Sequence, residues 1–404
     1  MIQELPSSIH PRTRIAALVL IVLGACVAVG GLYTAPHRTW PNLLLNGFYF
    51  TSLALSAALF LAAQRLTGAH WSASLRRLPE AFMMGLPAAA VLILVLFFGR
   101  DVLYPWARAS GLSDVPALAG KVQYLHPSWV FVRAISVFAA WLMITLLMRR
   151  ASLDQDRDLG RCLILDRRLT RYSALFVVVF AATFSVSAFD WILSLEPQWF
   201  STMFAIYLFA GTFVQGIAAV TLAAVIVKDK DPLRIVGTKS QLEDLGRLLF
   251  AFSTFWAYIW TCQYLLIWYG DIPLEVTHYV KRTNDHWIEL FGLNLVMNWL
   301  IPFIALLSVR AKSSPIILTL VSVVLLVGHW LDLYLLIMPA FFGVPEFGLP
   351  ELLTTIGYAA LFYRLFIRSL AKAPLVPLND PTMLADTINW SAFEGSTQHT
   401  LVQE

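Results

Sequence analysis

The chain has few of the residues that bind redox centres. Its three cysteines, Cys26, Cys162 and Cys262, stand far apart, and no Cys-x-x-Cys or Cys-x-x-Cys-His pattern occurs in 404 residues. Those patterns hold iron–sulfur clusters or attach haem covalently. We therefore expect neither centre in this chain, and no framework of disulfides.

Histidine is scarce where a membrane haem would need it. Of the eight histidines, only His329 lies deep within a long apolar segment. A haem held between two transmembrane helices takes two axial ligands, so a single deep histidine predicts that this chain binds no haem. We also expect no bound metal, and cofactors only on other proteins.

Charged residues make up only 13% of the chain, whereas 58% of the residues are hydrophobic. That balance lies far from the composition of soluble globular proteins. Segments of roughly 20 apolar residues are long enough to cross a bilayer as helices. The sequence predicts an all-α polytopic membrane protein with ten spans, at about 15–33, 42–63, 82–103, 129–148, 172–195, 200–227, 246–269, 289–308, 315–338 and 349–370.

The basic residues are distributed unevenly between the connections. If both termini lie on one side, that side receives most of the 29 Lys and Arg residues, among them Arg76, Arg77, Arg149 and Arg150. Connections rich in Lys and Arg face the cytoplasm. We therefore expect both termini to be cytoplasmic and the chain to contact the lipid bilayer, with no nucleic acid as a partner.

The spans suggest two groups of four, each followed by a turn. We expect these units in chain order: a cytoplasmic N-terminus (1–14), a first flanking helix (15–41), a first four-helix bundle (42–197), a second four-helix bundle (198–340), a second flanking helix, which is the tenth span (341–372), and a cytoplasmic tail (373–404).

The most informative residues are His329 and Asp332, which lie inside the apolar segment 315–338. Ionisable groups in hydrocarbon are costly and usually face a protein interior or a wet cavity. Residues three apart share one face of a helix, so these two side chains are expected to be neighbours. An imidazole beside a carboxyl group can hold or relay a proton.

Other polar residues are predicted to lie with this pair in the outer half of the membrane. Arg133 either extends to the outer headgroups or pairs with Asp190 or Asp332. Our hypothesis is that these residues form a proton route. We assign no catalytic residue and no metal site to the chain, and its quinone site, if it has one, is unknown. The route comprises Asp190, His329, Asp332, Arg133, Tyr258, Gln263, Glu196 and Ser253, with Asp244 and Arg247 at the cytoplasmic mouth.

Four stretches resemble a known family. They read YLHPSWVFVR at 124–133, FDWILSLEPQWFSTMF at 189–204, LGRLLFAFSTFWAYIWTCQYLLIWYGDIP at 245–273 and GHWLDLYLLIMP at 328–339. They resemble the NrfD/polysulfide-reductase family of quinone-interacting membrane subunits. Within it they are most similar to the ActF type, the second ten-helix subunit of bacterial alternative complex III.

The resemblance implies two four-helix bundles with two flanking helices, in the bacterial cytoplasmic (inner) membrane. It also implies a respiratory or photosynthetic complex that oxidises menaquinol or a similar quinol and reduces cytochrome c or a copper protein. The implied partners are a sister membrane subunit of the ActC type, an iron–sulfur subunit, c-type cytochrome subunits and small membrane subunits. The c-type haems and iron–sulfur clusters would be carried by those partners.

Two other functions remain open. A proton-coupled secondary transporter would also use an acidic residue and a histidine, although such sites usually lie near the bilayer midplane on helices that are broken. The helices of this chain are expected to be continuous, with their polar residues displaced outward. The chain could also be a purely structural anchor for peripheral subunits.

Overall fold

The computed structural model describes residues 11–108, 120–229, 239–381 and 383. These residues form helices and connections and include no β-strand. The predicted N-terminus and C-terminal tail lie largely outside the described residues. The long helices are α1 (Pro11–Thr34), α2 (Pro36–Leu66), α6 (Pro127–Arg157), α7 (Cys162–Trp191), α8 (Phe204–Val227), α10 (Lys239–Gly270), α15 (Pro315–Ile337) and α16 (Leu349–Leu370).

Shorter helices join or extend the long ones. They are η1 (His70–Leu75), α3 (Arg77–Met83), α4 (Leu86–Val95), η2 (Leu96–Gly99), α5 (Arg100–Leu103), η3 (Pro105–Ala107), η6 (Leu159–Arg161), η7 (Leu193–Leu195), α11 (Pro273–Arg282), α12 (Ile288–Leu295), the π-helical η8 (Val296–Leu300), α13 (Ile301–Ala305), α14 (Val309–Lys312) and η9 (Met338–Ala340).

Proline marks the start of many of these helices. It occupies one of the first two positions of α2, α6, α11, α15 and α16. Its fixed φ suits the first turn of a helix, where its missing N–H has no intrahelical partner to lose. The helix starts are therefore encoded locally, by a residue that needs no tertiary contact to act.

Eight helices in the described part of the chain are long and apolar enough to cross a membrane. This confirms the all-α polytopic class. α10 and α16, with 32 and 22 residues, are long enough to cross a membrane but are not among the eight. Ten spans and the orientation of the termini stay predictions. The eight are Arg12–Thr34, Pro36–Leu66, Arg77–Leu103, Pro127–Arg157, Leu159–Leu195, Phe204–Val227, Ile288–Ala305 and Pro315–Ala340.

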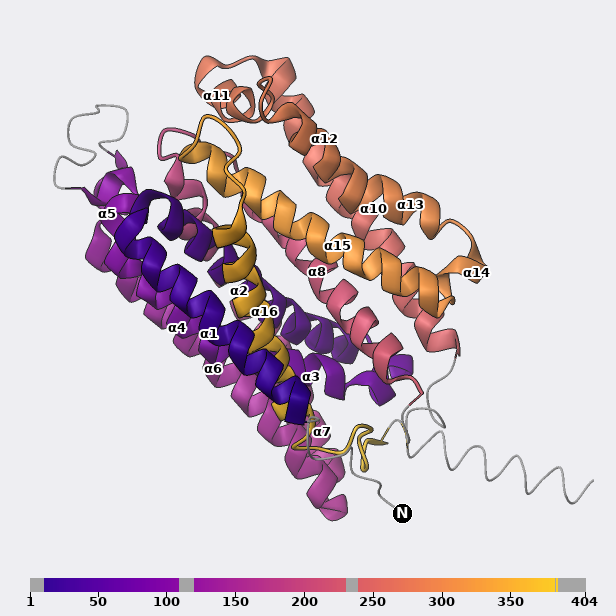
Figure 1. The fold of residues 1–404 in the computed structure, drawn as a ribbon. Helices are drawn as coiled ribbons and strands as arrows, with labels where there is room; N and C mark the ends of the chain where they lie inside the picture. Colours follow the sequence, from indigo (N-terminus) through magenta and orange to yellow (C-terminus); the bar gives the residue numbers. More distant parts are fainter. Residues whose placement is uncertain (1–10, 109–119, 230–238, 382, 384–404) are drawn as a thin grey trace, which may run out of the picture.

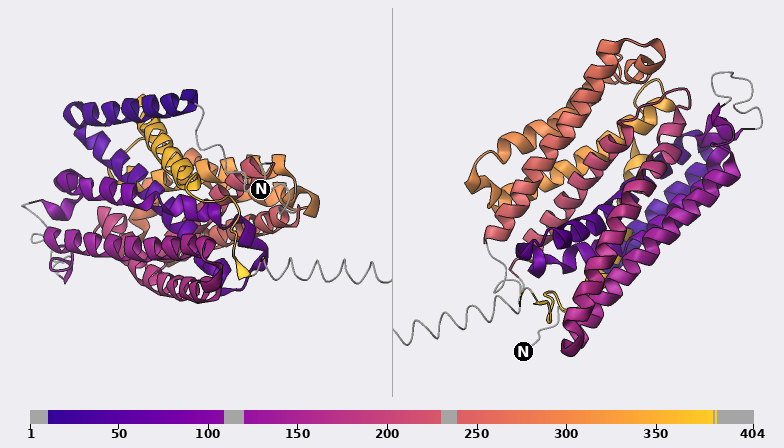
Figure 2. Two further views of the ribbon diagram at one scale, coloured as in Figure 1. Left: turned by 90° about the horizontal axis from the view of Figure 1, so that it is seen from below. Right: turned by 180° about the vertical axis from the view of Figure 1, so that it is seen from behind.

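The long helices run side by side in alternating directions (Figure 1). α1 begins and α16 ends at the same end of the molecule. Arg149 bonds there to the carbonyl of Ser369 near the end of α16, and Arg76 and Arg77 share the carboxylate of Glu80 with it; we call this end the basic end. α11 and α5 lie at the opposite end. The view from below in Figure 2 shows α1 at the edge of the structure, against α16.

Packing between the helices centres on α2 and α8. α2 contacts α3, α4 and α7, whereas α8 contacts α10 and α15, and the two also pack on each other. Every residue of α2 from Asn42 to Ala62 is buried. Because α2 and α8 pack together across the expected boundary near residue 197, the division into two bundles stays a prediction.

Two helices that we expected to be continuous are irregular. The span Arg77–Leu103 is divided among α3, α4, η2 and α5, and only Met84 and Gly85 leave the helical state. The span Ile288–Ala305 is helical throughout and consists of α12, the π-helical η8 and α13. Glycine weakens a helix interior, and a π segment is a local insertion into the α-helical ladder. The helices therefore continue across the expected spans, with one interruption at Met84–Gly85.

Candidate functional site

Asp332 is the centre of a buried hydrogen-bond group contributed by four helices. Its carboxylate accepts hydrogen bonds from the hydroxyl of Tyr207 on α8, from Nδ2 of Asn294 on α12 at 2.8 Å and from Nε1 of Trp256 on α10 at 3.3 Å. Asp332 itself is 2% exposed. Among the described residues no Lys or Arg nitrogen lies within 4 Å of it. All of its donors are therefore neutral groups.

His329 lies one turn before Asp332 on α15 and is equally buried. Its Nδ1 is 3.8 Å from an Asp332 oxygen, too far for a hydrogen bond, and neither ring nitrogen has a hydrogen-bond partner among the described residues. The expected adjacency of the two residues is present. A buried polar group without a partner usually bonds to ordered water.

Gly211 on α8 makes room for the imidazole. A Cβ atom at this position would lie 2.6 Å from Cε1 of His329 and 2.8 Å from its Nδ1. Those distances are far inside van der Waals contact, so only glycine lets α8 approach α15 this closely at the ring. The histidine side chain is consequently held between two helices.

Two asparagines continue the polar group toward the π-helical η8. Nδ2 of Asn298 donates to Oδ1 of Asn294 at 2.7 Å, and both residues are buried. Asn298 lies within η8 itself. π segments are often found at functional sites because they redirect side chains. The spacing of four residues places both amides on one face of the helix.

A cavity of about 20 Å³ adjoins the carboxyl group, lined by Tyr207, Gln263, Arg282, Asn294 and Asp332, among others. A site of that size with several polar partners is large enough for one water molecule. Oε1 of Gln263 is buried without a hydrogen-bond partner among the described residues, while its Nε2 is 3.4 Å from the Ser201 hydroxyl. The predicted contribution of Gln263 to this region agrees with its position.

Arg133 and Asp190 form a separate pair between α6 and α7. Nε of Arg133 is 2.8 Å from one Asp190 oxygen and Nη2 is 3.0 Å from the other, and the guanidinium lies 4.0 Å from the ring centre of Tyr124. Such two-point pairing is directional and strong. Of the two partners expected for Arg133, the structure selects Asp190. No contact among the described residues joins this pair to Asp332.

Glu196 belongs to a third group, with three basic residues of α11. Its carboxylate lies 2.5 Å from Nδ1 of His278, 2.8 Å from Nζ of Lys281 and 3.2 Å from Nη1 of Arg282. Burial alone would raise the pKa of Glu196, but Arg282, His278 and Lys281 together hold it well below the ordinary value. Burial, with Arg282 beside it, lowers the pKa of His278 to about 4.

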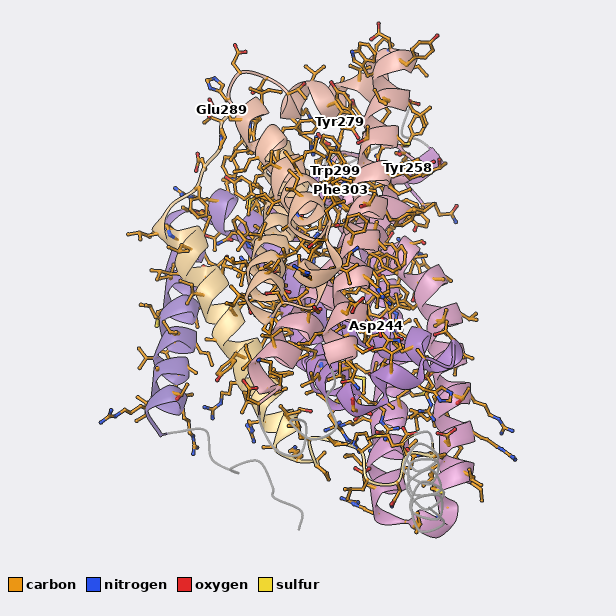
Figure 3. The ribbon with its side chains drawn as sticks, turned by 90° about the vertical axis from the view of Figure 1, so that its right-hand side faces the viewer. Asp244, Tyr258, Tyr279, Glu289, Trp299 and Phe303 are labelled. Atoms are coloured by element: carbon orange, nitrogen blue, oxygen red, sulfur yellow. The ribbon has the colours of Figure 1, made fainter. Side chains whose placement is uncertain are left out.

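The remaining predicted residues do not join Asp332. Tyr258 is 62% exposed and lies on the outside of α10, so it cannot feed the buried carboxyl group (Figure 3). Ser253 is buried but donates to the carbonyl of Phe250 in its own helix. Asp244 and Arg247 pair with each other at 3.0 Å near the start of α10. The expected residues therefore do not form one hydrogen-bonded set. The Asp332 and Glu196 groups share the small cavity through His278 and Arg282, whereas Arg133–Asp190 and Asp244–Arg247 are separate pairs.

Sequence reasoning missed Tyr207 and Trp256, which donate to Asp332 from other helices. Tyr207 is buried and Trp256 is 1% exposed. Because Tyr and Trp are also frequent at membrane interfaces, their residue types alone did not mark them as partners of a buried carboxyl group. Sequence reasoning also missed His278 and Arg282, whose i,i+4 spacing places them on one face of α11. That spacing was a usable signal, whereas the choice among aromatic residues depended on the rotation of each helix.

An apolar groove of about 580 Å³ lies between α2, α8, α15 and α16, where a quinone could be sought. Three of its polar side chains already donate to protein oxygens: Tyr49 to Leu326, Trp330 to Asn46 and Thr355 to Glu351. The fourth, Tyr363, is 45% exposed. A quinone headgroup needs donors for both of its carbonyl oxygens, and one tyrosine does not supply them, so we assign no quinone site to the groove.

Among the described residues, no group of three or more His, Cys, Asp or Glu side chains is placed to hold a metal ion. Cys26, Cys162 and Cys262 are free thiols. In comparisons with known proteins, no family model and no curated protein matches this chain.

Proposed function

We propose that this protein is a membrane subunit of a quinol:electron-acceptor oxidoreductase and that it moves protons through the group around Asp332. The observation that carries the proposal is a buried carboxyl group in a long apolar helix, held by three neutral donors, with no Lys or Arg nitrogen within 4 Å in the described part of the chain. A titratable group at such depth is costly, and such residues usually mark functional sites.

Groups that can donate or accept a proton lie on either side of Asp332. The Tyr207 hydroxyl can pass a proton as well as donate one, and the adjoining cavity has room for a water molecule near Gln263. On the next turn toward the basic end, His329 offers two ring nitrogens without hydrogen-bond partners among the described residues. These groups define the route in which Asp332 is the central proton carrier.

The oxidoreductase part of the proposal rests on the resemblance of four stretches of sequence to the NrfD/polysulfide-reductase family, and more narrowly to the ActF type of subunit. In such a complex the iron–sulfur and cytochrome partners carry the electrons and a sister membrane subunit lies alongside. Menaquinol or a similar quinol is the reductant. The proposed location is the bacterial inner membrane, with both termini in the cytoplasm and ten spans.

Proton translocation by the assembled complex in proteoliposomes tests the proposal. Asp332→Asn keeps the size of the side chain and removes its titratable proton. We expect electron transfer to continue while the number of protons moved per electron falls. Purification in mild detergent first establishes whether c-type haem co-migrates with the chain, as membership of such a complex requires.

Asp154→Asn is the matched control, because Asp154 is 58% exposed, lies 3.9 Å from Arg157 and is no part of the proposed proton route. If both variants move as many protons per electron as the unmodified complex, Asp332 carries none of them. If the chain purifies alone and is active as a solute carrier, the oxidoreductase assignment fails while the proton route remains.

The second candidate function is a proton-coupled secondary transporter, and one observation favours it. The π-helical η8 interrupts the regular α-helical bonding between α12 and α13, and Asn294 and Asn298 lie at this irregularity with Asn294 bonded to Asp332. Polar groups at irregular positions of membrane helices are typical of substrate sites in transporters. Uptake of a solute driven by a proton gradient, in liposomes that contain this chain alone, separates the two functions.

A further inference from the structure

A network of buried arginines and carboxylates occupies the basic end of the first group of helices. Glu80 on α3 is bonded by Arg77 at 2.7 Å and by Arg149 of α6, and it lies 3.3 Å from Nε of Arg76. Arg77 also pairs with Asp156. All of these side chains are less than a tenth exposed. No part of the proposed proton route includes this network.

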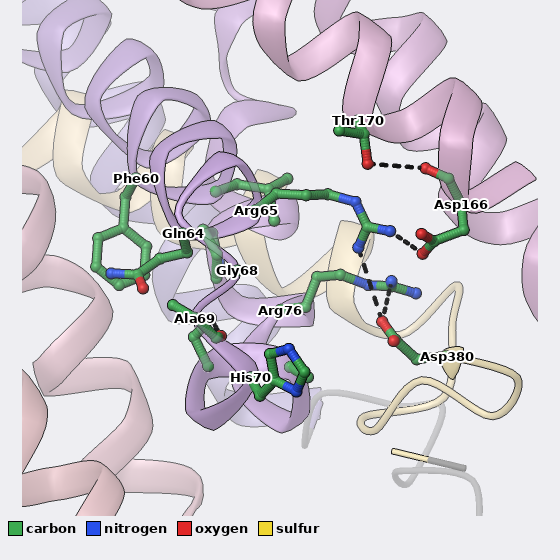
Figure 4. A pocket seen from close by; sticks show the side chains of 14 residues that line it. Phe60, Gln64, Arg65, Gly68, Ala69, His70, Arg76, Asp166, Thr170 and Asp380 are labelled. Carbon is green, nitrogen blue, oxygen red and sulfur yellow. Dashed lines mark hydrogen bonds and ion pairs between the residues drawn. The ribbon is translucent and has the colours of Figure 1, made fainter. Parts of the chain in front are cut away.

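Asp380, beyond the end of α16, extends this network from a segment that is distant in sequence. Its carboxylate lies 2.5 Å from Nη1 of Arg76 and 3.8 Å from Nη1 of Arg65, and its side chain is 1% exposed. Figure 4 shows the carboxylate against both guanidinium groups, with Asp166 bonded to the other side of Arg65.

The segment around Asp380 is held by further contacts. Nδ2 of Asn379 donates to the last carbonyls of α6, at Gln155 and Asp156, both at 3.0 Å. The backbone N–H of Leu378 donates to Asp156 Oδ1 at 3.1 Å, and Leu375 is 3% exposed. Residues 371–381 contain no long helix and cross the basic end from α16 to α6. We call them the strap.

Among the described residues, the charges of the network balance only when the strap is in place. The helical body contributes four arginines, Arg65, Arg76, Arg77 and Arg149, against three carboxylates, Glu80, Asp156 and Asp166. Asp380 supplies the fourth negative charge. A buried cation without a partner is strongly unfavourable. The body alone therefore has a vacancy for one anion, which the strap fills.

Next to Asp380 lies a cavity of about 120 Å³, lined by Gln64, Arg65, His70, Arg76 and Asp380, among others. Nη2 of Arg76 and Nε of Arg65 are buried without a hydrogen-bond partner among the described residues. At about 30 Å³ for each water molecule in the liquid, this space holds about four waters. Planar guanidinium groups with free N–H donors are the usual ligands of phosphate oxygens.

We infer that the strap is displaceable and that, when it lifts, the site formed by Arg65 and Arg76 binds a phosphate-type oxyanion in place of the Asp380 carboxylate. The source of the oxyanion is either inorganic phosphate or the headgroup of an anionic lipid. The carboxylate of the strap and the phosphate compete for the same two guanidinium groups.

Hydrogen exchange and thermal unfolding of the full-length protein test the inference. Asp380→Asn removes the charge and keeps the size of the side chain. We expect amide exchange in residues 371–381 to become at least about tenfold faster, and the melting temperature to fall by a few degrees. Asp154→Asn is the matched control, because Asp154 is 58% exposed and pairs only weakly, at 3.9 Å, with Arg157.

Anion binding is measured on the same variants. Inorganic phosphate should raise the melting temperature of Asp380→Asn saturably, and that of the unmodified protein much less, when chloride at equal ionic strength is the reference. The double variant Asp380→Asn/Arg76→Gln should not respond. A second experiment compares the melting temperature of the same variants in phosphatidylcholine nanodiscs with and without phosphatidylglycerol. If phosphatidylglycerol stabilises Asp380→Asn and inorganic phosphate does not, the source of the oxyanion is a lipid headgroup.

If amide exchange in residues 371–381 is the same in Asp380→Asn as in the unmodified protein, the Asp380 carboxylate does not hold the strap and the inference fails. Equal responses of the unmodified protein, the single variant and the double variant to both anion sources would refute the oxyanion site. If Asp380→Asn does not fold, Asn379→Ala loosens the strap without changing a charge. We then expect the same direction of change in exchange and in the phosphate response.

Discussion

The hydroxyl of Tyr207 on α8 donates a hydrogen bond to the Asp332 carboxylate on α15. Tyr207→Phe removes one of the two donors to Oδ1 of Asp332, the other being Nδ2 of Asn294, which should cost about 1–3 kcal/mol of unfolding free energy. In the Asp332→Asn background the same change should cost less. A double-mutant cycle of denaturant unfolding in detergent measures this coupling, and additive costs would mean that the two residues do not interact.

Acid should destabilise the group around Glu196. Burial lowers the pKa of His278 to about 4, below its ordinary value of 6.5. As the pH drops from about 6.5 to about 4, the unfolded chain therefore takes up a proton that the folded chain does not, and the unfolding free energy falls. The pKa of Glu196 lies below its ordinary 4.5, so its contribution is present above pH 4.5 and is lost below it. Both effects lower the unfolding free energy as the pH falls.

His278→Gln should therefore flatten the dependence of stability on pH between about 6.5 and 4, by at most about 3 kcal/mol over that range. The measurement is the unfolding free energy at a series of pH values. The same substitution at His286, which is exposed in the neighbouring connection, controls for the loss of a histidine. A pH profile that is unchanged by His278→Gln contradicts the prediction.

The crossing of α1 and α16 depends on two glycines. A Cβ atom on Gly24 would lie 2.7 Å from Cα of Gly357, whereas one on Gly30 would have nothing within 4 Å. Small residues let membrane helices approach closely. Gly24→Leu should lower the unfolding free energy by about 1–3 kcal/mol or more, as overpacking does. Gly30→Leu should have little effect, and equal melting temperatures of the two variants would argue against a tight crossing.

Glu80 is the carboxylate on which the arginines at the basic end converge. Glu80→Gln would leave Arg77 and Arg149 with a neutral acceptor in a buried place, and losing one partner of a buried ion pair costs about 3–5 kcal/mol. We expect a clear drop in melting temperature and yield of folded protein. Glu243→Gln serves as the control, because its partner Arg247 is 60% exposed. Equal losses in both variants would contradict the prediction.

Helix positions could be predicted well because they follow from apolar runs and prolines. The segment 315–338 begins and ends within a residue of α15. The charged segment 149–171 was harder: α6 continues to Arg157 and α7 begins at Cys162, so both helices extend beyond their apolar parts. Composition marks where a chain can cross hydrocarbon, but a helix continues for as long as its backbone bonds and caps allow.

The partners of the polar residues could not be predicted as well. His329 and Asp332 lie on one helix, so their spacing alone made them neighbours. Tyr207 and Tyr258 were equally plausible neighbours from other helices, but only the rotation of α8 and α10 in the packed structure places the first inside and the second outside. Helix rotation is set by many contacts at once, and no local pattern encodes it.

Arg282 has a mechanical effect on the helix that carries Asp332. Its guanidinium donates at 2.8 Å to the carbonyls of both Leu335 and Leu336 and at 2.6 Å to that of His278. It thereby couples the surface helix α11 to the last turn of α15, immediately after the buried carboxyl group. A load applied to α11 from outside must either break these bonds or drag the end of α15 with it.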